Sequence, residues 1–347
     1  MSIYKIKHSI PESDYPKLVK FIKEHWKENH ALVLSKELMD FQHYNPVDKT
    51  YNFVVAENQL TNEYDSLQGY IPTWQFDYNL LKNGDYWGAI WKTRDDIDND
   101  EKSIIGVDVY LGMRELPFCQ STGGIGLSQY SIKAAKNMRI QVGYMHQYYM
   151  INNDCTSFKI ASHVNAGFIS RMVGYNSNEL EVKKMAFDEL PEIKGFYRPF
   201  KSVLYLINRY QKHPIFHYDL YGVFDNKQLC YVMVARKVTV NGSSILRIVD
   251  VLGELKGSIY NSMQNLLKEE KCEYVDFLNY GIDSEVFFNM GFRELDYEKD
   301  EIIIPNYFEP FEQRNIKLYM SYKCKFPYIA FKGDADQDRP NIIINND

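Results

Sequence analysis

The sequence has few cysteines and no long apolar run, and both absences restrict what the chain can be. Its five cysteines are odd in number and scattered, with no CxxC or Cys/His ligand spacing. We therefore expect free thiols, no disulfide framework and no metal site. No stretch approaches the roughly 18 apolar residues of a membrane span, and the first residues, MSIYKIKHSI, lack the apolar centre of a signal peptide. These features favour a cytoplasmic protein without membrane insertion.

An excess of basic charge is also missing. The 40 Lys and Arg residues are outnumbered by 46 Asp and Glu residues, which gives a net charge of −6, and both signs are mixed along the chain. Nucleic acids and anionic membranes bind to basic surfaces. We expect neither as a partner, and the sequence leaves the oligomeric state open.

Aromatic residues are abundant by contrast, with 28 tyrosines and 20 phenylalanines. A tyrosine combines an apolar ring with a polar hydroxyl, so it suits a domain core, a domain interface or a groove for a sugar or base ring. Core packing is the favoured reading, and the groove is the alternative. A chain of 347 residues is long for one core, and domains of about 150–200 residues are the usual outcome.

The first half of the chain predicts the element order β-α-α-β-β-β-α-β-α-β. Helical spacing of apolar residues marks the helices, and apolar runs between polar turns mark the strands. The predicted strands are 4–10, 51–58, 66–77, 86–94, 118–128 and 142–152, and the predicted helices begin near Tyr15 and cover 35–44, 104–116 and 129–140.

The second half repeats this order. Strands are predicted at 218–226, 227–240, 244–253, 272–281, 293–304 and 316–325, with helices at 258–271 and 284–292. NGSS at 241–244 predicts a hairpin turn, and Ser258 is a candidate helix cap. We expect an N-terminal domain at 1–152, a helical connecting region at 153–212 and a C-terminal domain at 213–347, whose tail from Asp334 is polar and has no core pattern.

This order is similar to that of GNAT acyltransferases, present twice. FFNMGFREL resembles the closing unit of that family, and SIKAAKNMRIQVGYM stands in the same place in the first half. YNFVVAE, GYIPTWQFD, WGAIWK, IIPNYFEPF and DADQDRPN resemble bacterial two-domain GNAT proteins of surface-polysaccharide (O-antigen, lipopolysaccharide) biosynthesis. Some of these transfer 3-hydroxybutanoyl from CoA to dTDP-3-amino-3,6-dideoxy-D-galactose.

The resemblance implies a mixed α/β fold of two tandem GNAT-like domains. It also implies an N-acyltransferase that uses acyl-CoA as co-substrate and a nucleotide-linked (dTDP) amino sugar as acceptor, in a cleft between the domains. Two alternatives stay open: a catalytically inactive GNAT scaffold that acts as a binding module, and an aminoacyl-transferring relative of the fold.

For CoA, the resemblance favours the N-terminal domain. The family binds the pyrophosphate on a Gly-rich loop and the helix that follows, where free backbone N–H groups attract anions. That motif is incomplete here, with Gly106 as its one remaining glycine and three aspartates nearby; VLGELKGSI in the second half, with Gly253 and Gly257, is the alternative. STGGIGLSQ favours close strand packing over a nucleotide loop. The predicted CoA-binding residues are Ala89, Ile90, Trp91, Lys92, Arg94, Ile105, Gly106 and Val107.

Acyl transfer to an amine requires a base and an acid. The resemblance makes Tyr149 the first candidate for the acid and Tyr148 the second. His146 lies beside them in MHQYYMIN, and His30 and Asp77 are further candidates for catalysis. Packing and helix capping are the alternative roles of these side chains. The candidates for acceptor binding are His43, Asp250, Asn279, Asn306, Tyr307 and Arg339, of which Arg339 suits a diphosphate.

Overall fold

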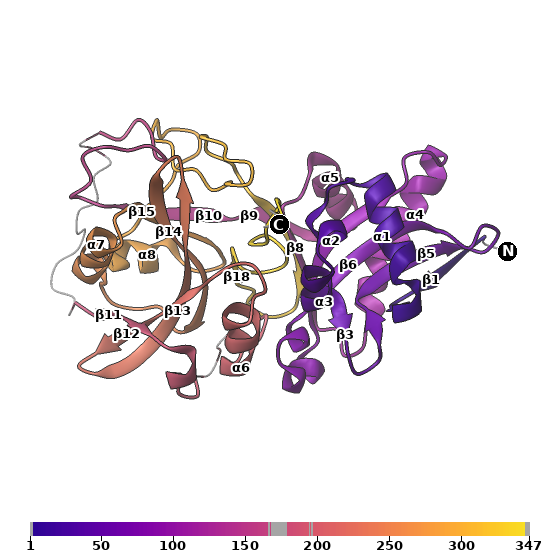
Figure 1. Ribbon diagram of the computed structural model, residues 1–347, viewed down its shortest axis with the longest axis horizontal. Coiled ribbons are helices and arrows are strands. Elements are labelled where there is room, and N and C mark those ends of the chain that lie inside the picture. Colours follow the sequence, from indigo (N-terminus) through magenta and orange to yellow (C-terminus); the bar gives the residue numbers. More distant parts are fainter. Residues whose placement is uncertain (1–2, 166, 168–178, 194, 196, 344–347) are drawn as a thin grey trace.

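The computed structural model describes residues 3–165, 167, 179–193, 195 and 197–343. Two sheets form the centres of two domains, with the N-terminal residues in one and the orange C-terminal strands in the other (Figure 1). Within the described residues, no helix is both long and apolar enough to cross a membrane, and no three His, Cys, Asp or Glu side chains are grouped as metal ligands.

The first sheet has the strand order β1-β5-β6-β7-β8-β17-β9. Its strands are β1 (Tyr4–Lys7), β5 (Phe53–Asn58), β6 (Tyr64–Pro72), β7 (Asp85–Thr93), β8 (Ser121–Ile125), β17 (Tyr319–Cys324) and β9 (Gln141–Tyr144). Its helices are α1 (Tyr15–His25), α2 (Ala31–Leu34), α3 (Lys36–His43), α4 (Asn99–Gly112) and α5 (Gln129–Asn137), and a small separate sheet joins β2 (Ile10–Pro11), β4 (Thr50–Tyr51) and β3 (Tyr44–Asn45).

The second sheet has the order β11-β12-β13-β14-β15-β10-β16, with β18 also on β15. Its strands are β11 (Glu181–Met185), β12 (Asp219–Asp225), β13 (Gln228–Val240), β14 (Ser243–Gly253), β15 (Cys272–Tyr280), β10 (His146–Ile151), β16 (Arg293–Glu294) and β18 (Ala330–Phe331). Its helices are α6 (Val203–Leu206), continued by a π-helical turn at Ile207–Gln211, then α7 (Tyr260–Glu269) and α8 (Ser284–Met290).

The two domains exchange one strand each. In both sheets, the sixth strand comes from the other half of the chain. β17 lies between β8 and β9, and β10 lies between β15 and β16. The expected strand at 142–152 is therefore divided between the sheets, because β9 stays in the first and β10 enters the second. A division of the chain at residue 152 does not coincide with the division into sheets.

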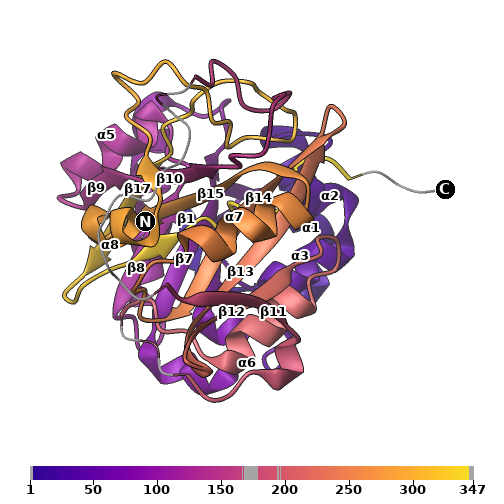
Figure 2. The same ribbon diagram turned by 90° about the vertical axis from the view of Figure 1, so that its left-hand side faces the viewer.

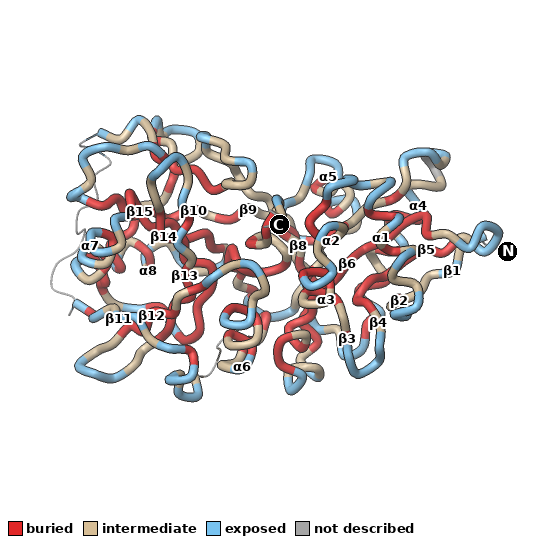
Figure 3. Tube along the Cα trace, in the orientation of Figure 1, coloured by how far each residue is buried: buried red, intermediate tan, exposed pale blue. Residues whose placement is uncertain are grey.

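Helices pack against both faces of each sheet. In the first, α1–α3 pack on one face around Phe53 and Val55, and α4 packs on the other around Val54 and Ala56. In the second, α7 and α8 cover one face (Figure 2), and α6 packs on the other, with a buried core that continues into the first domain (Figure 3). Side chains from both domains share this core, including Trp87 and Val249.

Local sequence signals explain several elements. The hairpin predicted at NGSS joins β13 and β14, with Asn241 and Gly242 at φ of 53° and 71°, the left-handed values of a tight hairpin turn. The hydroxyl of Ser128 caps α5 by accepting from the N–H of Ser131 at 3.1 Å. The helices predicted at 104–116, 129–140, 258–271 and 284–292 are confirmed in their central residues.

The structure differs from three local expectations. The strand predicted at 293–304 is limited to Arg293–Glu294. In the region 153–212, which was expected to be helical, the described residues contain the strand Glu181–Met185 besides the helical segment 203–211. The tail from Asp334 is not a solvated end, because Asp334 and Ala335 are fully buried between the domains.

Candidate functional site

In the first sheet, β7 and β8 separate partway along their length. The two strands pair in parallel from Asp85 with Ser121 to Gly88 with Gly124. Beyond this point β7 continues to Thr93 on β6 alone, and β8 ends at Ile125. A cavity of about 240 Å³ occupies the gap. Among the described residues, no strand pairs with this side of β7 beyond Gly88, which leaves its backbone groups available to a ligand.

The glycines of the STGGIG segment serve this gap in two ways. A Cβ on Gly123 would lie 2.1 Å from the Tyr328 hydroxyl oxygen and 2.7 Å from the Trp87 ring, so close packing requires glycine there. The nearest atom to a Cβ on Gly124 is 4.0 Å away, and Gly124 lines the cavity. Gly123 follows the strand-packing expectation, while Gly124 leaves open space.

A second cavity, of about 710 Å³, lies between α4 and α5 and shares Trp91, Ser128 and Ser131 with the gap. Lys92 and Lys102 line it and hold the Asp95 carboxylate at 2.6 and 2.5 Å. Hydrogen bonds from Lys102 and Lys92 lower the pKa of Asp95 to about 2. This site, beside the first turn of α4, binds an anionic group in the form of a side chain.

The predicted CoA-binding residues divide into two groups. Six line the cavities: Ala89, Ile90, Trp91, Lys92, Gly106 and Val107. Arg94 and Ile105 line none of them. The Arg94 guanidinium binds Asp65 and Asp96, and Ile105 is buried in the core under α4.

The second sheet has the same gap, and the chain itself fills it. Strands β14 and β15 pair in parallel from Ser244 to Ile248 and then separate. β18 enters the gap, where Phe331 pairs with Asn279 and the N–H of Gly333 donates to Val249 O at 2.7 Å. Asn279, an expected acceptor contact, donates its amide to Ala330 O at 3.0 Å and so holds this filling strand.

The N-terminus of α7, which corresponds to that of α4, is filled as well. The Glu179 carboxylate accepts from the N–H groups of Asn261 at 2.7 Å and Ser262 at 3.3 Å. Ser258, the candidate cap, donates its hydroxyl to the same carboxylate at 2.7 Å. At Gly257 a Cβ would lie 2.7 Å from the Leu180 side chain, so this glycine serves packing.

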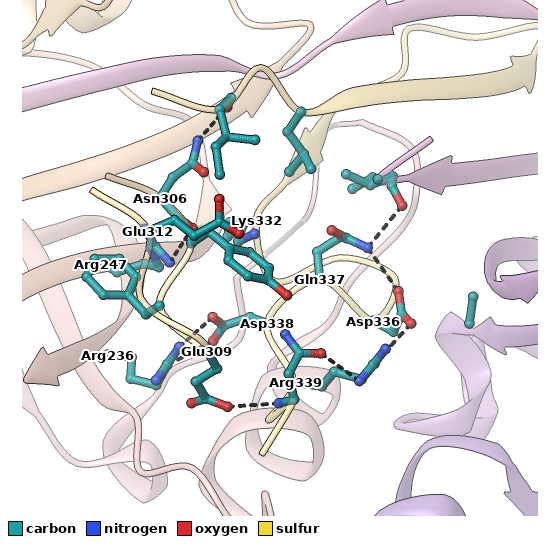
Figure 4. A pocket seen from close by; sticks show the side chains of 18 of the residues that line it. Arg236, Arg247, Asn306, Glu309, Glu312, Lys332, Asp336, Gln337, Asp338 and Arg339 are labelled. Carbon is teal, nitrogen blue, oxygen red and sulfur yellow. Dashed lines mark hydrogen bonds and ion pairs between the residues drawn. The ribbon is translucent and has the colours of Figure 1, made fainter. Parts of the chain in front are cut away.

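A third cavity, of about 420 Å³, lies between the domains and shares Trp26, Ala89, Ile125 and Gly126 with the gap (Figure 4). We call it the interdomain pocket. The gap therefore adjoins both the cavity between α4 and α5 and the interdomain pocket. Charged residues from the second domain and the tail line it: Arg236, Arg247, Glu309, Glu312, Arg314, Lys332, Asp336, Asp338 and Arg339.

Asp336 and Gln337 lie on the side of this pocket that faces the first domain (Figure 4). The Gln337 amide donates to Ile125 O at 3.0 Å and to Asp336 Oδ1 at 3.1 Å. Arg339 Nε donates to Asp336 Oδ2 at 3.1 Å. Burial opposes ionisation, but Arg339 outweighs it and lowers the pKa of Asp336. An ionised carboxylate thus lies where the pocket meets the gap.

Three of the expected acceptor contacts line this pocket: Asn306, Tyr307 and Arg339. Asn306 is fixed by its amide, which donates to Ile316 O at 2.8 Å. Asp250 does not line the pocket. It accepts from Lys201 at 2.6 Å, and Lys201 also pairs with Asp334 at 2.8 Å, so Asp250 anchors the tail.

Three of the expected catalytic residues lie in β10, and none of them lines the three cavities described above: Tyr149, Tyr148 and His146. Tyr149 is fully buried in an apolar cluster, and burial raises its pKa to about 12. Tyr148 stacks on Phe287 at 3.8 Å. His146 binds Glu294 through Nδ1. The exchange of β10 into the second sheet takes these side chains away from the gap.

The remaining candidates support the local backbone. His30 Nδ1 accepts from the N–H of Leu32 at 3.2 Å and caps α2, while its Nε2 lies 3.2 Å from Arg339. Burial lowers the pKa of His30 to about 3 and that of His43 to about 4, so both are neutral. Asp77 accepts from Ser202 at 2.5 Å and from the N–H of Asn79.

Sequence reasoning missed Arg236, Arg247, Lys332, Asp336 and Asp338. Arg236 and Arg247 stand within apolar strand runs, VMVARKV and SILRIVD, and a charge in such a run must be paired or must face a cleft. That signal was available. The two tail residues, Asp336 and Asp338, carried none, because DADQD has the composition of a solvated end.

The fold has known counterparts, although no protein-family profile and no curated protein matches the sequence. A GCN5-related N-acetyltransferase from Anabaena variabilis is 9% identical, with 91% of this chain and 72% of that chain covered and a TM-score of 0.50. A conserved protein from Enterococcus faecalis, described as a probable N-acyltransferase, is 6% identical, with 93% and 72% covered and a TM-score of 0.53. The expected mixed α/β architecture of two tandem GNAT-like domains is confirmed.

Proposed function

We propose that the chain is an acyl-CoA-dependent N-acyltransferase that binds its donor in the first domain and its acceptor in the interdomain pocket. The observation that carries this proposal is the contrast between the two gaps. The gap between β7 and β8 is a cavity connected to an anion site at one end and to a charged pocket at the other. The equivalent gap of the second sheet contains β18.

The donor fits this path in one direction. The CoA pyrophosphate would replace the Asp95 carboxylate between Lys92 and Lys102, beside the first turn of α4. The pantetheine arm would follow the free edge of β7 past Trp91 and Ala89. The thioester would then reach Ile125 and Gly126, where gap and pocket meet. Free backbone N–H groups along this edge are suited to polarise its carbonyl.

Asp336 is suited to receive the acceptor's amino group. Its ionised carboxylate would bind the ammonium and take one proton, which leaves a neutral amine. The amine nitrogen then forms a bond to the thioester carbon, the carbon–sulfur bond breaks, and the CoA thiolate takes up the second proton of the nitrogen. Transfer is direct, and His146, Tyr148 and Tyr149 of β10 have no part in it.

For the acceptor, the proposal is the amino group of a dTDP-linked 3-amino-3,6-dideoxyhexose, with 3-hydroxybutanoyl as the acyl group, in surface-polysaccharide synthesis. Asn306, Tyr307 and Arg339 line the pocket and provide amide, aromatic and guanidinium groups. These are the groups that bind a sugar hydroxyl, a ring and a diphosphate.

Two measurements test the proposal. CoA and acyl-CoA should raise the melting temperature of the protein in proportion to the logarithm of ligand concentration. Release of free CoA thiol from 3-hydroxybutanoyl-CoA should then depend on an amino sugar nucleotide. Stabilisation by CoA without turnover of any amine would favour a binding module, and the absence of stabilisation at millimolar CoA would exclude the donor assignment.

A further inference from the structure

We propose that the interdomain pocket recognises its ligand by an oxyanion, a phosphate or a carboxylate, which pairs with the ammonium group of Lys332. This rests on the proposed function only in treating the ligand as the acyl acceptor, and it adds what class of acceptor is bound. Lys332 has no assigned role in the sequence interpretation or in the donor path.

Lys332 is buried in the pocket, and the described residues supply no partner for its ammonium group. Its exposed fraction is 5%, and it lines the pocket near Arg247 and Asn306 (Figure 4). Its neighbours Phe331 and Gly333 are held by the second sheet, through pairing with Asn279 and a hydrogen bond to Val249. The backbone at Lys332 is therefore fixed, and no hydrogen bond or ion pair to Nζ is found among the described residues.

The other cations of the pocket have partners from the protein. Arg236 binds Asp338 through two hydrogen bonds of 3.1 and 2.9 Å. Arg247 binds Asp276 in the same way, at 3.1 and 2.7 Å.

The two remaining guanidinium groups complete this pattern. Arg339 binds Asp336 at 3.1 Å, and Arg314 binds Glu312 at 2.6 Å. The Glu309 carboxylate accepts from the N–H groups of Asn341 and Ile342. Lys332 is thus the lining cation for which the described part of the chain supplies no anion.

The surroundings make this ammonium group costly in the absence of a ligand. Burial and the neighbouring Arg247 guanidinium lower the pKa of Lys332 to about 8. Asp338 and Asp276 act in the opposite direction and Arg236 in the same direction as Arg247. A buried charge without a partner destabilises a fold, and such groups are found where a ligand supplies the missing charge.

An oxyanion meets this need better than a neutral ligand. It would accept from Lys332 Nζ and lie in the positive field of Arg247, whose two carboxylate hydrogen bonds to Asp276 keep it in place. A phosphate of a nucleotide-linked sugar and the carboxylate of an amino acid or peptide share this chemistry.

The test compares Lys332→Met with wild type and with Lys237→Met, which removes a lysine that pairs with Glu270 outside the pocket. The probes are dTDP, inorganic pyrophosphate and L-glutamate at constant ionic strength, with binding followed by calorimetry and thermal shift. We expect at least one probe to bind wild type and Lys237→Met alike and to bind Lys332→Met about tenfold more weakly or worse. Binding of dTDP and pyrophosphate alone identifies a phosphate, and binding of L-glutamate alone identifies a carboxylate.

Lys332→Met should also melt at a higher temperature than wild type, because it removes an unpaired buried charge. Lys332→Arg, which keeps the charge, provides a second measurement and should retain anion binding. Equal affinity of Lys332→Met and wild type would overturn the proposal, as would the failure of all three probes to bind a wild-type protein that binds CoA. If wild type binds an anion probe but does not bind CoA, the acyltransferase proposal is overturned, while the anion site is retained.

Discussion

The two domains have the same strand order and differ in what occupies the equivalent gap between their fourth and fifth strands. In the first domain the gap is a cavity, and in the second it holds β18. The helix that follows starts beside two lysines that share the Asp95 carboxylate in one case, and against the Glu179 carboxylate in the other. The unpaired edge of a sheet must find partners. The second domain takes them from its own chain, and we infer that the first takes them from a ligand.

Filling the gap of the first sheet, as β18 fills that of the second, should have the largest effect on CoA binding. A side chain at Gly124 finds open space for its Cβ, with the nearest atom 4.0 Å away, so Gly124→Leu should fold and extend into the cavity. We expect the Kd for CoA to rise on the order of a hundredfold, about 2.7 kcal/mol. Calorimetry measures it, with Thr239→Leu, an exposed position of β13, as control. Undiminished CoA binding would mean that the donor lies elsewhere.

The segment that fills the gap of the second sheet continues to Asp336, the carboxylate proposed to act on the acceptor in the interdomain pocket. Asp336→Asn removes the proposed proton acceptor, and we expect kcat/KM to fall roughly a hundredfold. The affinity for CoA should not change. A variant that loses both together, as seen in steady-state kinetics and calorimetry, would indicate a structural role for this carboxylate.

The anion site beside α4 can be compared directly with its filled counterpart at α7. Lys102→Ala removes one of two cations from this site, and the Kd for CoA should rise about tenfold. The rise should be smaller at high salt, since part of the interaction is exposed to solvent. Lys268→Ala, on α7, is the matched control and should leave the Kd unchanged. An equal effect of both substitutions would abolish the proposed difference between the domains.

Lys332 gives the interface between the domains a pH dependence. Its pKa is about 8 in the folded protein and near 10.5 in the unfolded chain, so between these values the folded state binds fewer protons. The free energy of unfolding should therefore rise with pH from about 8 to 10.5. Chemical denaturation of wild type and Lys332→Met across this range measures the contribution. A rise of the same size in both would assign it to other groups.

The smallest effect is expected from weakening the carboxylate contact at the N-terminus of α7. Glu179→Gln weakens the interaction with the N–H groups of Asn261 and Ser262, and we expect a loss of about 0.5–1 kcal/mol of stability. CoA affinity should stay the same, because β18 still fills the gap. A gain of a second CoA site, detected as a changed binding stoichiometry, would contradict this account.

The tandem fold could be predicted from the sequence because its signals are local. Helical spacing, apolar runs and a turn such as Asn241-Gly242 each depend on a few neighbouring residues. The exchange of β10 and β17 could not be predicted in this way. Both are short runs of apolar and aromatic residues, and nothing within such a run says which sheet it will join.

The same difference between local and long-range signals applies to the candidate site. The residues of WGAIWK were recognised by a continuous segment, and Ala89, Ile90, Trp91 and Lys92 all line the cavities. The charged side of the interdomain pocket combines strands β13 and β14 with the tail. Asp338 is buried there because Arg236, far away in the sequence, binds it, and such a pair leaves no trace in either segment alone.

The strand exchange also limits the order in which the molecule can be built. β8 forms one wall of the gap in the first sheet and pairs with β17 on its other side. β17 lies far along the chain. During synthesis the first sheet therefore waits for residues of the second half before its edge is closed. The same late segment brings the tail that carries Asp336. A nascent chain therefore completes the first sheet and the interdomain pocket only after the same late segment has been made.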